Sequence, residues 1–213
     1  MRIWRFGDSV TALRDVLDRG GILAVPTESS YGLAVDPRSE RGVRAIYQVK
    51  GRETTKALPV IVGDLDQLAQ LGIDPGSPEI APFRSFWPAA LSVIASTAES
   101  LPAGGGEPRL AVRVPAHEGL RALLVELGRP LTATSANLAG EPPILVLPEL
   151  EPLLAGADAV AVDGGALEGG APSTLVELRG VTLRVLRRGR FPVDELRRRF
   201  STATVEIIVE NPS

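Results

Sequence analysis

Apolar residues recur along this chain in two patterns that alternate, one with helical spacing and one of short unbroken runs. Helical spacing predicts helices, in chain order, over residues 10–19, 39–50, 64–71, 77–87, 119–127 and 193–200. Short apolar runs predict strands at 22–25, 58–62, 91–95, 110–114, 131–134, 159–162, 174–178 and 182–186. Helices and strands that alternate in this way predict an α/β fold with a twisted, open sheet of mixed parallel and antiparallel strands flanked by helices.

Glycine and proline mark the ends of several of these elements. Gly20-Gly21 ends the first helix, and Arg179-Gly180 predicts a hairpin turn between the last two strands. Pro59 lacks a backbone N–H, so its strand is expected either to lie at a sheet edge or to begin there.

The chain shows no internal repeat and no change of composition that would separate two domains. Stretches rich in glycine and proline at 102–108 and 163–172 are interpreted as surface loops. We therefore expect a single domain over residues 1–200, followed by a short C-terminal tail at 201–213.

Composition excludes several kinds of site and partner. The 213 residues carry a net charge of −3, so the whole chain is not a basic nucleic-acid binder and any anion site has to be a local patch. With no cysteine and one histidine, His117, thiolate chemistry is excluded and a zinc site is disfavoured. Phosphate-loop and dinucleotide-binding glycine motifs are also missing. No apolar run reaches the ~18 residues of a membrane span, and the N-terminus has no signal-like apolar core, so we expect a cytoplasmic protein without a membrane partner.

Lysine is rare and confined to one place. Lys50 and Lys56 are the two lysines, against 21 arginines. Lysine is a compact, mobile point charge and arginine a rigid fork, so a site that follows a moving phosphate or carboxylate can require lysine. Alternatively, Lys50 ends the helix 39–50 and complements its dipole. Lys50 alone does not decide between the two interpretations.

Arg113 is the one charged residue within the apolar strand 110–114. By the strand period of two, the apolar side chains share one face and Arg113 falls on the other, beside Ala111. An arginine next to a small residue is consistent with a face that opens onto a cleft. The alternative is an edge strand with Arg113 in solvent, and spacing alone slightly favours this alternative.

Polar side chains gather at the ends of several predicted strands. They are Thr27 and Tyr31 after the strand 22–25, Ser135 and Asn137 after 131–134, Ser173 before 174–178, and Arg187 after 182–186. Each alone is compatible with an ordinary polar turn or a helix cap. Together they predict one anion-binding pocket of cations and hydroxyls with no acid–base pair, at the place where open α/β sheets bind ligands. Such a pocket suits binding ATP and transferring its phosphate-bearing part by positioning and charge stabilisation.

At these residues the sequence resembles the YrdC/TsaC family of threonylcarbamoyl-AMP synthases, from about Gly20 to about Arg197. The family hallmark is Lys-x-Arg followed far downstream by Ser-x-Asn. In this chain the two motifs read Lys50-Gly51-Arg52 and Ser135-Ala136-Asn137. Further matching segments, in the family's order and at similar spacing, are 26–33, 86–88, 110–115, 172–176 and 186–189.

The resemblance implies a YrdC-like sheet with a concave, positively charged cavity. It implies a nucleotidyltransferase that combines L-threonine, bicarbonate and ATP into threonylcarbamoyl-AMP and pyrophosphate, the first step of threonylcarbamoyladenosine modification of tRNA. Mg²⁺ is expected on the ATP phosphates, with no metal ligand from protein side chains. Downstream tRNA threonylcarbamoyl transferase proteins are the expected partners.

The resemblance also assigns residues to the two substrates. Lys50 and Arg52 are implied as catalytic and, with Ser135, Asn137 and Arg187, as ATP-binding. The residues implied for threonine are Thr27, Tyr31, Arg113 and Ser173, with Arg113 facing the carboxylate.

The chain departs from the family pattern at several positions. Glu53 stands where a proline often follows Lys-x-Arg, and Arg188 replaces the proline of Arg-Pro-Gly. The segments 87–92 and 138–145 also differ, which leaves room for a divergent paralogue. Because the chain ends soon after the synthase domain, it resembles the short form of the family.

Two other functions are compatible with the same residues. One is a non-catalytic module whose cavity holds tRNA or double-stranded RNA, although the net charge of −3 disfavours it. The other is a carbamoyl-adenylate enzyme with a different acceptor.

Overall fold

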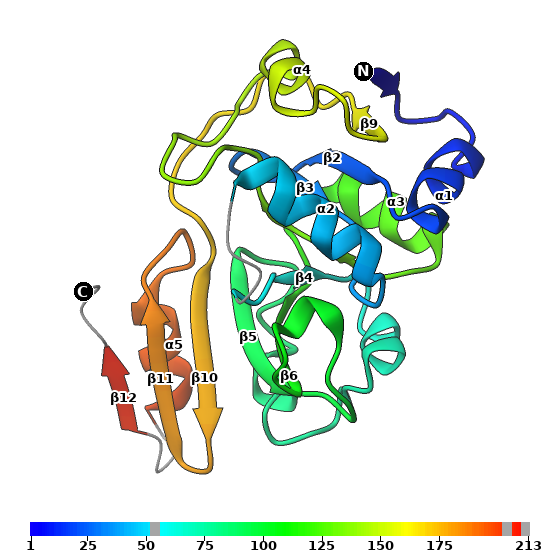
Figure 1. Ribbon diagram of the computed structural model, residues 1–213. Helices are drawn as coiled ribbons and strands as arrows, with labels where there is room; N and C mark the ends of the chain where they lie inside the picture. The colour runs from blue at the N-terminus through cyan, green and yellow to red at the C-terminus, as the bar shows by residue number, and fades with distance from the viewer. Residues whose placement is uncertain (52–55, 202–205, 210–213) are drawn as a thin grey trace.

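The computed structural model describes residues 1–51, 56–201 and 206–209, whose strands form two sheets (Figure 1). The smaller sheet has the order β1 (Arg2–Trp4), β9 (Ala159–Val162), β2 (Ile22–Pro26), β3 (Tyr31–Ala34), β8 (Thr134–Ser135). The larger sheet has the order β12 (Glu206–Val209), β11 (Thr182–Arg187), β10 (Thr174–Arg179), β5 (Leu91–Ser96), β6 (Arg109–Arg113), β4 (Val60–Ile61), β7 (Leu131–Thr132). Both sheets mix parallel and antiparallel pairs, as expected for the predicted fold class.

The two sheets are connected through one extended segment, residues 131–135. Its first part, β7, pairs with β4, and its last part, β8, pairs with β3. Between them the N–H of Ala133 donates to the carbonyl oxygen of Pro59 at 2.8 Å. The apolar run predicts one strand here and a single sheet. Two sheets form instead, because this strand changes partner at Ala133.

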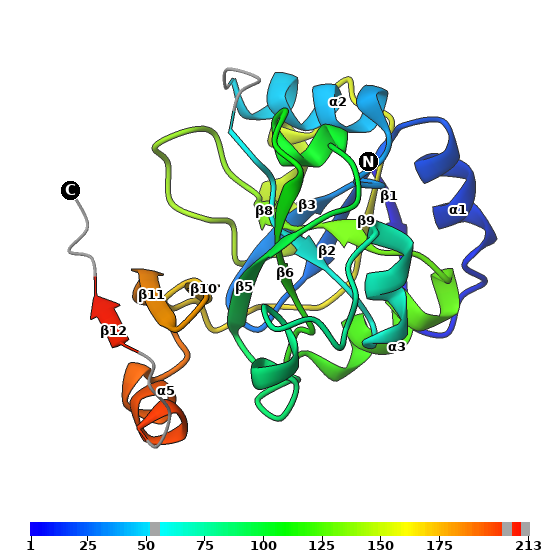
Figure 2. The ribbon, with the colours of Figure 1, turned by 90° about the horizontal axis from the view of Figure 1, so that it is seen from below.

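Helices cover the smaller sheet on both faces. The helices are α1 (Thr11–Asp18), α2 (Glu40–Lys50), α3 (Glu118–Leu127), α4 (Leu150–Leu153) and α5 (Val193–Phe200). Short 3₁₀ helices span Asp66–Leu71, Ala81–Phe83, Pro102–Gly104 and Leu147–Glu149. Figure 2 shows α2 on one side of β2 and β3 and α3 on the other, with α5 beside β11.

The alternation of side chains along β2 divides the apolar core into two parts. Leu23 and Val25 pack with the apolar faces of α1 and α3. Ile22 and Ala24 point to the opposite face, where they join Ile46 of α2 and a cluster that continues into the larger sheet. Packing therefore fixes the end of α2, and with it Lys50, against the region where the two sheets meet.

The prediction of a helix over residues 77–87 is wrong. The structure has turns there and one short 3₁₀ helix at Ala81–Phe83. Pro82 explains the difference, because it has no N–H to donate and its ring clashes with the preceding helical turn. The segment is held instead by the carboxylate of Glu79, which accepts from the N–H and hydroxyl of Ser96.

Three strands lie where none was predicted. Tyr31–Ala34, which follows the predicted strand 22–25, is β3 and pairs antiparallel with β2. Arg2–Trp4 is β1, and 206–209, within the expected tail, is β12 and pairs parallel with β11.

Across the described ranges, none of the helices has the length and apolar character needed to cross a membrane.

Candidate active site

A cavity of about 270 Å³ opens where strand ends of both sheets converge. The residues expected at the site that line it are Thr27, Tyr31, Arg113, Ser135, Ser173 and Arg187. Lys50 and Asn137 lie next to Ser135, as described below. Arg52 lies outside the described residues.

The order of strands in the larger sheet explains why residues far apart in the sequence meet here. β10 and β5 begin side by side, with Thr174 opposite Leu91. β11 runs antiparallel to β10 and therefore ends, at Arg187, opposite Leu175. β6 runs antiparallel to β5 and ends at Arg113. The same end of these strands therefore carries Ser173, Arg187 and Arg113.

Lys50 joins the two motifs that the sequence places far apart. It is the last residue of α2, and its side chain is buried. The ammonium group donates to the backbone carbonyl of Ser135 and to both the carbonyl oxygen and the side-chain oxygen of Asn137, at 3.0 and 2.7 Å. The Ser135 hydroxyl donates to the same Asn137 side-chain oxygen at 2.7 Å. Lys50 thus ends the helix and also orders the Ser-x-Asn loop at the cavity wall.

Arg113 is buried at the end of β6 and forms an ion pair with Glu28. β6 lies between β5 and β4, so the interpretation of an edge strand with Arg113 in solvent was wrong. Burial lowers the pKa of Arg113 to about 10, and the nearby positive charge of Arg187 contributes in the same direction. The guanidinium therefore stays charged at neutral pH but is poorly solvated, which favours an anionic ligand.

Arg187 is held against Ser173. Its Nε and Nη2 atoms donate to the Ser173 carbonyl oxygen at 3.1 and 3.0 Å, and Nη2 also reaches the Ser173 hydroxyl at 3.2 Å. The buried hydroxyl of Ser92 lies 2.8 Å from that of Ser173. Although Arg187 as a whole residue is exposed, its guanidinium group packs against this loop, and this local burial lowers its pKa.

Thr27 and Tyr31 shape the wall on the side of the smaller sheet. The Thr27 hydroxyl donates to the Ser30 carbonyl at 2.7 Å and closes the turn between β2 and β3. The Tyr31 hydroxyl donates to the Gly165 carbonyl at 2.9 Å and accepts from the N–H of Gly164 at 3.1 Å. Burial raises the pKa of Tyr31, against the effect of the Gly164 hydrogen bond, so Tyr31 remains a neutral hydroxyl.

The charges of the cavity determine what it can bind. Three cationic side chains, Lys56, Arg113 and Arg187, are among its lining residues, together with hydroxyl groups. Arginine matches carboxylate and phosphate oxygens through paired N–H donors. The cavity is therefore suited to a small ligand with carboxylate or phosphate groups.

The model of the family described as telomere recombination, Sua5/YciO/YrdC, matches residues 15–189. The chain belongs to this family. The resemblance found in the sequence is thereby confirmed. A threonylcarbamoyl-AMP synthase of Chromohalobacter salexigens is 38% identical to this chain over 186 residues. The match covers 84% of this chain and 96% of the relative.

Solved structures share the fold of this chain, and the Pyrococcus abyssi relative is longer than this chain. A threonylcarbamoyl-AMP synthase of Pyrococcus abyssi is 33% identical over 181 residues, and the match spans 83% of this chain and about half, 53%, of that protein. The structure of P. abyssi Sua5 complexed with L-threonine has a TM-score of 0.81 and 27% identity, over 97% of this chain and 62% of that one. E. coli YciO, at 21% identity, has a TM-score of 0.74 over 90% of this chain and 96% of its own and shows the fold alone.

Some residues of the candidate active site were not predicted from the sequence. These residues reach the site through partners that are distant in the chain. Glu28 pairs with Arg113, and Ser92 contacts Ser173. Arg190 donates to the backbone carbonyl of Glu28. Glu28 lies inside the matching segment 26–33, which was the one available signal. Nothing in the local spacing indicates that its carboxylate faces Arg113.

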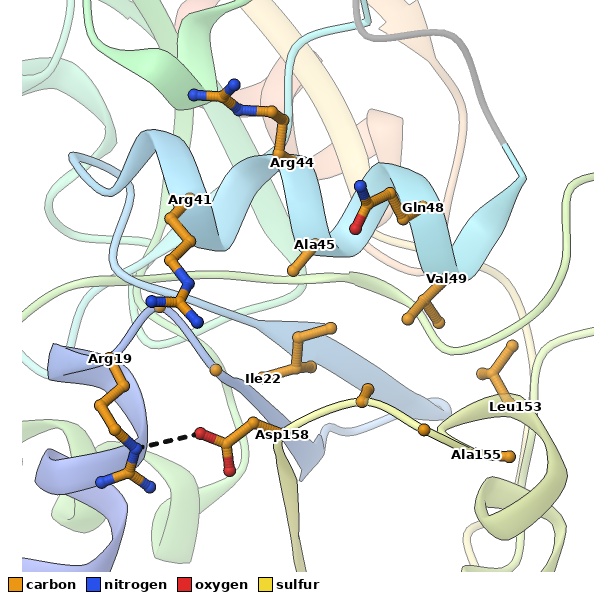
Figure 3. Close-up of a pocket in the computed structure, with 14 residues that line it drawn as sticks. Arg19, Ile22, Arg41, Arg44, Ala45, Gln48, Val49, Leu153, Ala155 and Asp158 are labelled. Carbon is orange, nitrogen blue, oxygen red and sulfur yellow. Dashed lines mark hydrogen bonds and ion pairs between the residues drawn. The ribbon is translucent and has the colours of Figure 1, made fainter.

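A second, larger cavity of about 830 Å³ lies between α2, the start of β2 and the loop that joins α4 to β9 (Figure 3). Arg41 and Ala45 of α2 line it, together with Arg19 and the loop that leads to Asp158. Asp158 pairs with Arg19 at 3.2 Å. Of the residues that the resemblance assigns to threonine or ATP, those that the structure describes do not line this cavity, so it is separate from the candidate active site.

Proposed function

We propose that this chain is a nucleotidyltransferase that makes threonylcarbamoyl-AMP and pyrophosphate from L-threonine, bicarbonate and ATP. One observation supports this most directly. The buried Arg113, the Arg187–Ser173 pair and the loop ordered by Lys50 converge on one small cavity. These residues are the ones that the family resemblance assigns to the two substrates, and a relative 38% identical carries this activity in its name.

The geometry supports a division of the cavity between the substrates. Arg113 would bind the threonine carboxylate, with Ser173, Thr27 and Tyr31 around the rest of the amino acid. Arg187 would bind ATP, together with Ser135, Asn137, Lys50 and Arg52. Ser173 links the two halves, because it accepts from Arg187 and lines the same cavity as Arg113. The substrates would therefore meet between the two arginines.

Charge stabilisation is the main contribution that these residues can make. The amine of threonine attacks bicarbonate with loss of water, or carbon dioxide with loss of a proton, to give a carbamate. A carbamate oxygen then attacks the α-phosphorus of ATP, and the bond from that phosphorus to the leaving pyrophosphate breaks. Carbamate and phosphate repel each other, and fixed cations at the cavity wall lower this repulsion in the transition state. The cavity wall would also shield one side of the carbamate from water.

Mg²⁺ is proposed to enter with ATP. The arginine and hydroxyl groups of the lining fit phosphate oxygens, which in turn are good Mg²⁺ ligands. When bound to the phosphates, Mg²⁺ would stabilise charge on the leaving pyrophosphate.

The chemistry of the proposed product indicates which class of protein uses it next. Threonylcarbamoyl-AMP carries an activated acyl group, so we propose transfer to tRNA by separate tRNA threonylcarbamoyl transferase proteins. The proposed location is the cytoplasm, where ATP and tRNA are available.

Pyrophosphate release from ATP, measured with and without L-threonine and bicarbonate, tests the proposal. We expect release that requires both, and a nucleotide product with the mass of threonylcarbamoyl-AMP. Release that is indifferent to threonine, or that proceeds equally with another amine, would instead support a different acceptor. Binding of RNA with a steep loss of affinity in salt, and no release of pyrophosphate, would support the non-catalytic alternative.

A further inference from the structure

Glu28 is the carboxylate that pairs with Arg113, the buried arginine of the site. It lies in the turn between β2 and β3, directly after Thr27, and its side chain is 13% exposed. The turn is held in place on two sides. The Thr27 hydroxyl closes it through Ser30, and Arg190 donates to the backbone carbonyl of Glu28. Glu28 is therefore a fixed negative charge directly behind Arg113 and between Thr27 and Ser29, three residues that line the cationic cavity.

The two oxygens of the Glu28 carboxylate have different surroundings. Oε1 accepts from Nη1 of Arg113. Oε2 is buried, and no hydrogen-bond donor of the described residues reaches it. A buried carboxylate oxygen normally has a donor, because it has lost its hydration. The Arg113–Glu28 pair therefore offers a positive group and an unused acceptor side by side.

An α-amino acid carries the matching pair of charges. Its carboxylate and its ammonium group are attached to the same carbon atom, so a receptor needs a cation and an anion that are also adjacent. We propose that Glu28 is a substrate-binding residue, whose Oε2 accepts a hydrogen bond from the α-amino group while Arg113 binds the substrate carboxylate. This assignment rests on the proposed function and identifies how the site selects an amino acid over a simple hydroxy acid.

A purely structural role for Glu28 makes a different prediction. If Glu28 only held Arg113 in position, its loss would weaken every carboxylate ligand to the same extent. If Glu28 binds the amino group, its loss would weaken only ligands that carry this group. Two ligands and one conservative variant distinguish the two roles.

The experiment measures the Kd of L-threonine and of (R)-3-hydroxybutyrate, which keeps the carboxylate and hydroxyl and lacks the amine. Calorimetry is carried out on the full chain and on Glu28→Gln, in which the amide oxygen can still accept from Arg113. Glu168→Gln is the matched control, because it removes the same charge from a carboxylate that is 93% exposed and faces Arg190 at 4.0 Å.

We expect the wild-type preference for threonine over hydroxybutyrate to fall about 10- to 100-fold in Glu28→Gln, the worth of one charge-assisted hydrogen bond. Hydroxybutyrate should bind as well as before or better, and Glu168→Gln should keep the wild-type preference. An equal loss for both ligands, or an unchanged preference, would overturn the assignment of Glu28 alone. Wild-type protein that binds no threonine would overturn the proposed function and the assignment with it.

Discussion

Lys50 and Asn137 lie 87 residues apart in the sequence and are joined by two hydrogen bonds from one ammonium group. The donor is at the C-terminal end of α2, and both acceptors are in the loop that follows β8. A helix that packs on the smaller sheet thereby fixes Ser135 and the loop that follows it at the cavity wall. The lysine of one family motif acts, in this structure, on the backbone of the other.

Asn137→Ala should lower both stability and activity. The substitution removes the side-chain oxygen that accepts from the buried Lys50 ammonium and from the Ser135 hydroxyl. We expect a loss of about 1–3 kcal/mol in the free energy of unfolding, the usual cost of weakening the hydrogen bonds of a buried charged group. Urea unfolding measures the first effect and threonine-dependent pyrophosphate release the second. Leu138→Ala is the control, since Leu138 is 52% exposed in the same loop and should change stability by less than about 0.5 kcal/mol.

Arg113→Met should destabilise the fold by leaving the Glu28 carboxylate buried without its partner. Breaking a buried ion pair costs about 3–5 kcal/mol, and we expect the lower end because the Glu28 side chain keeps 13% exposure. The double variant Arg113→Met with Glu28→Gln should regain part of this loss in denaturant unfolding. Arg44→Met removes an exposed i,i+4 partner of Glu40 and should cost less than about 0.5 kcal/mol. A double variant less stable than Arg113→Met would contradict the pairing.

The sequence predicted the face of Arg113 but not its neighbours. A period of two places Arg113 opposite the apolar side chains of its strand, whatever pairs with that strand. The pairing itself depends on the long-range contacts of β6 with β5 and β4. Spacing therefore could not decide between an edge in solvent and a buried position, and only the assembled sheet shows the latter.

Two other features could not be predicted from local sequence patterns, because they depend on contacts between distant parts of the chain. The change of sheet at Ala133 depends on Pro59 and β3, which come from distant parts of the chain. The ion pair of Glu28 with Arg113 spans 85 residues. By contrast, Lys50 was singled out from the sequence because lysine is rare in this chain, and the Ser-x-Asn motif was identified through the family resemblance.

Gly189→Ala should disturb the cavity without touching a polar side chain. A Cβ at this position would lie 2.2 Å from the Pro172 carbonyl oxygen and 2.5 Å from the Ser173 carbonyl carbon. These are backbone atoms, so the two loops would have to separate, and Ser173 and Arg187 would move apart. We expect a loss of about 1–3 kcal/mol in unfolding free energy and a raised KM for threonine.

Gly76→Ala is the matched control for the effect at Gly189. Its new Cβ would approach only the flexible side chain of Asp74, at 3.3 Å. Stability and KM should stay near wild type in this variant. If Gly189→Ala behaved in the same way as Gly76→Ala, the tight contact between the two loops would not be what positions Ser173.

His117 should make stability depend on pH through the start of α3. It is the N-cap residue, and its Nδ1 accepts from the N–H of Leu120 at 3.1 Å, which requires an unprotonated nitrogen. Burial lowers the pKa of His117 below its ordinary 6.5, and Arg121 adds to this against the effect of a backbone hydrogen bond. Because the folded pKa is below the unfolded one, this stabilisation is complete above pH 6.5 and is lost as the pH falls through the folded value.

His117→Asn isolates this effect, because asparagine is a strong N-cap residue that does not titrate. Urea unfolding of both proteins between about pH 8 and pH 5 should show wild type losing about 1 kcal/mol relative to the variant towards the acid end. Carboxylates that titrate in the same range are common to both proteins and cancel in the difference. A difference between the two proteins that stays constant over this range would show that the neutral imidazole does not stabilise the start of α3.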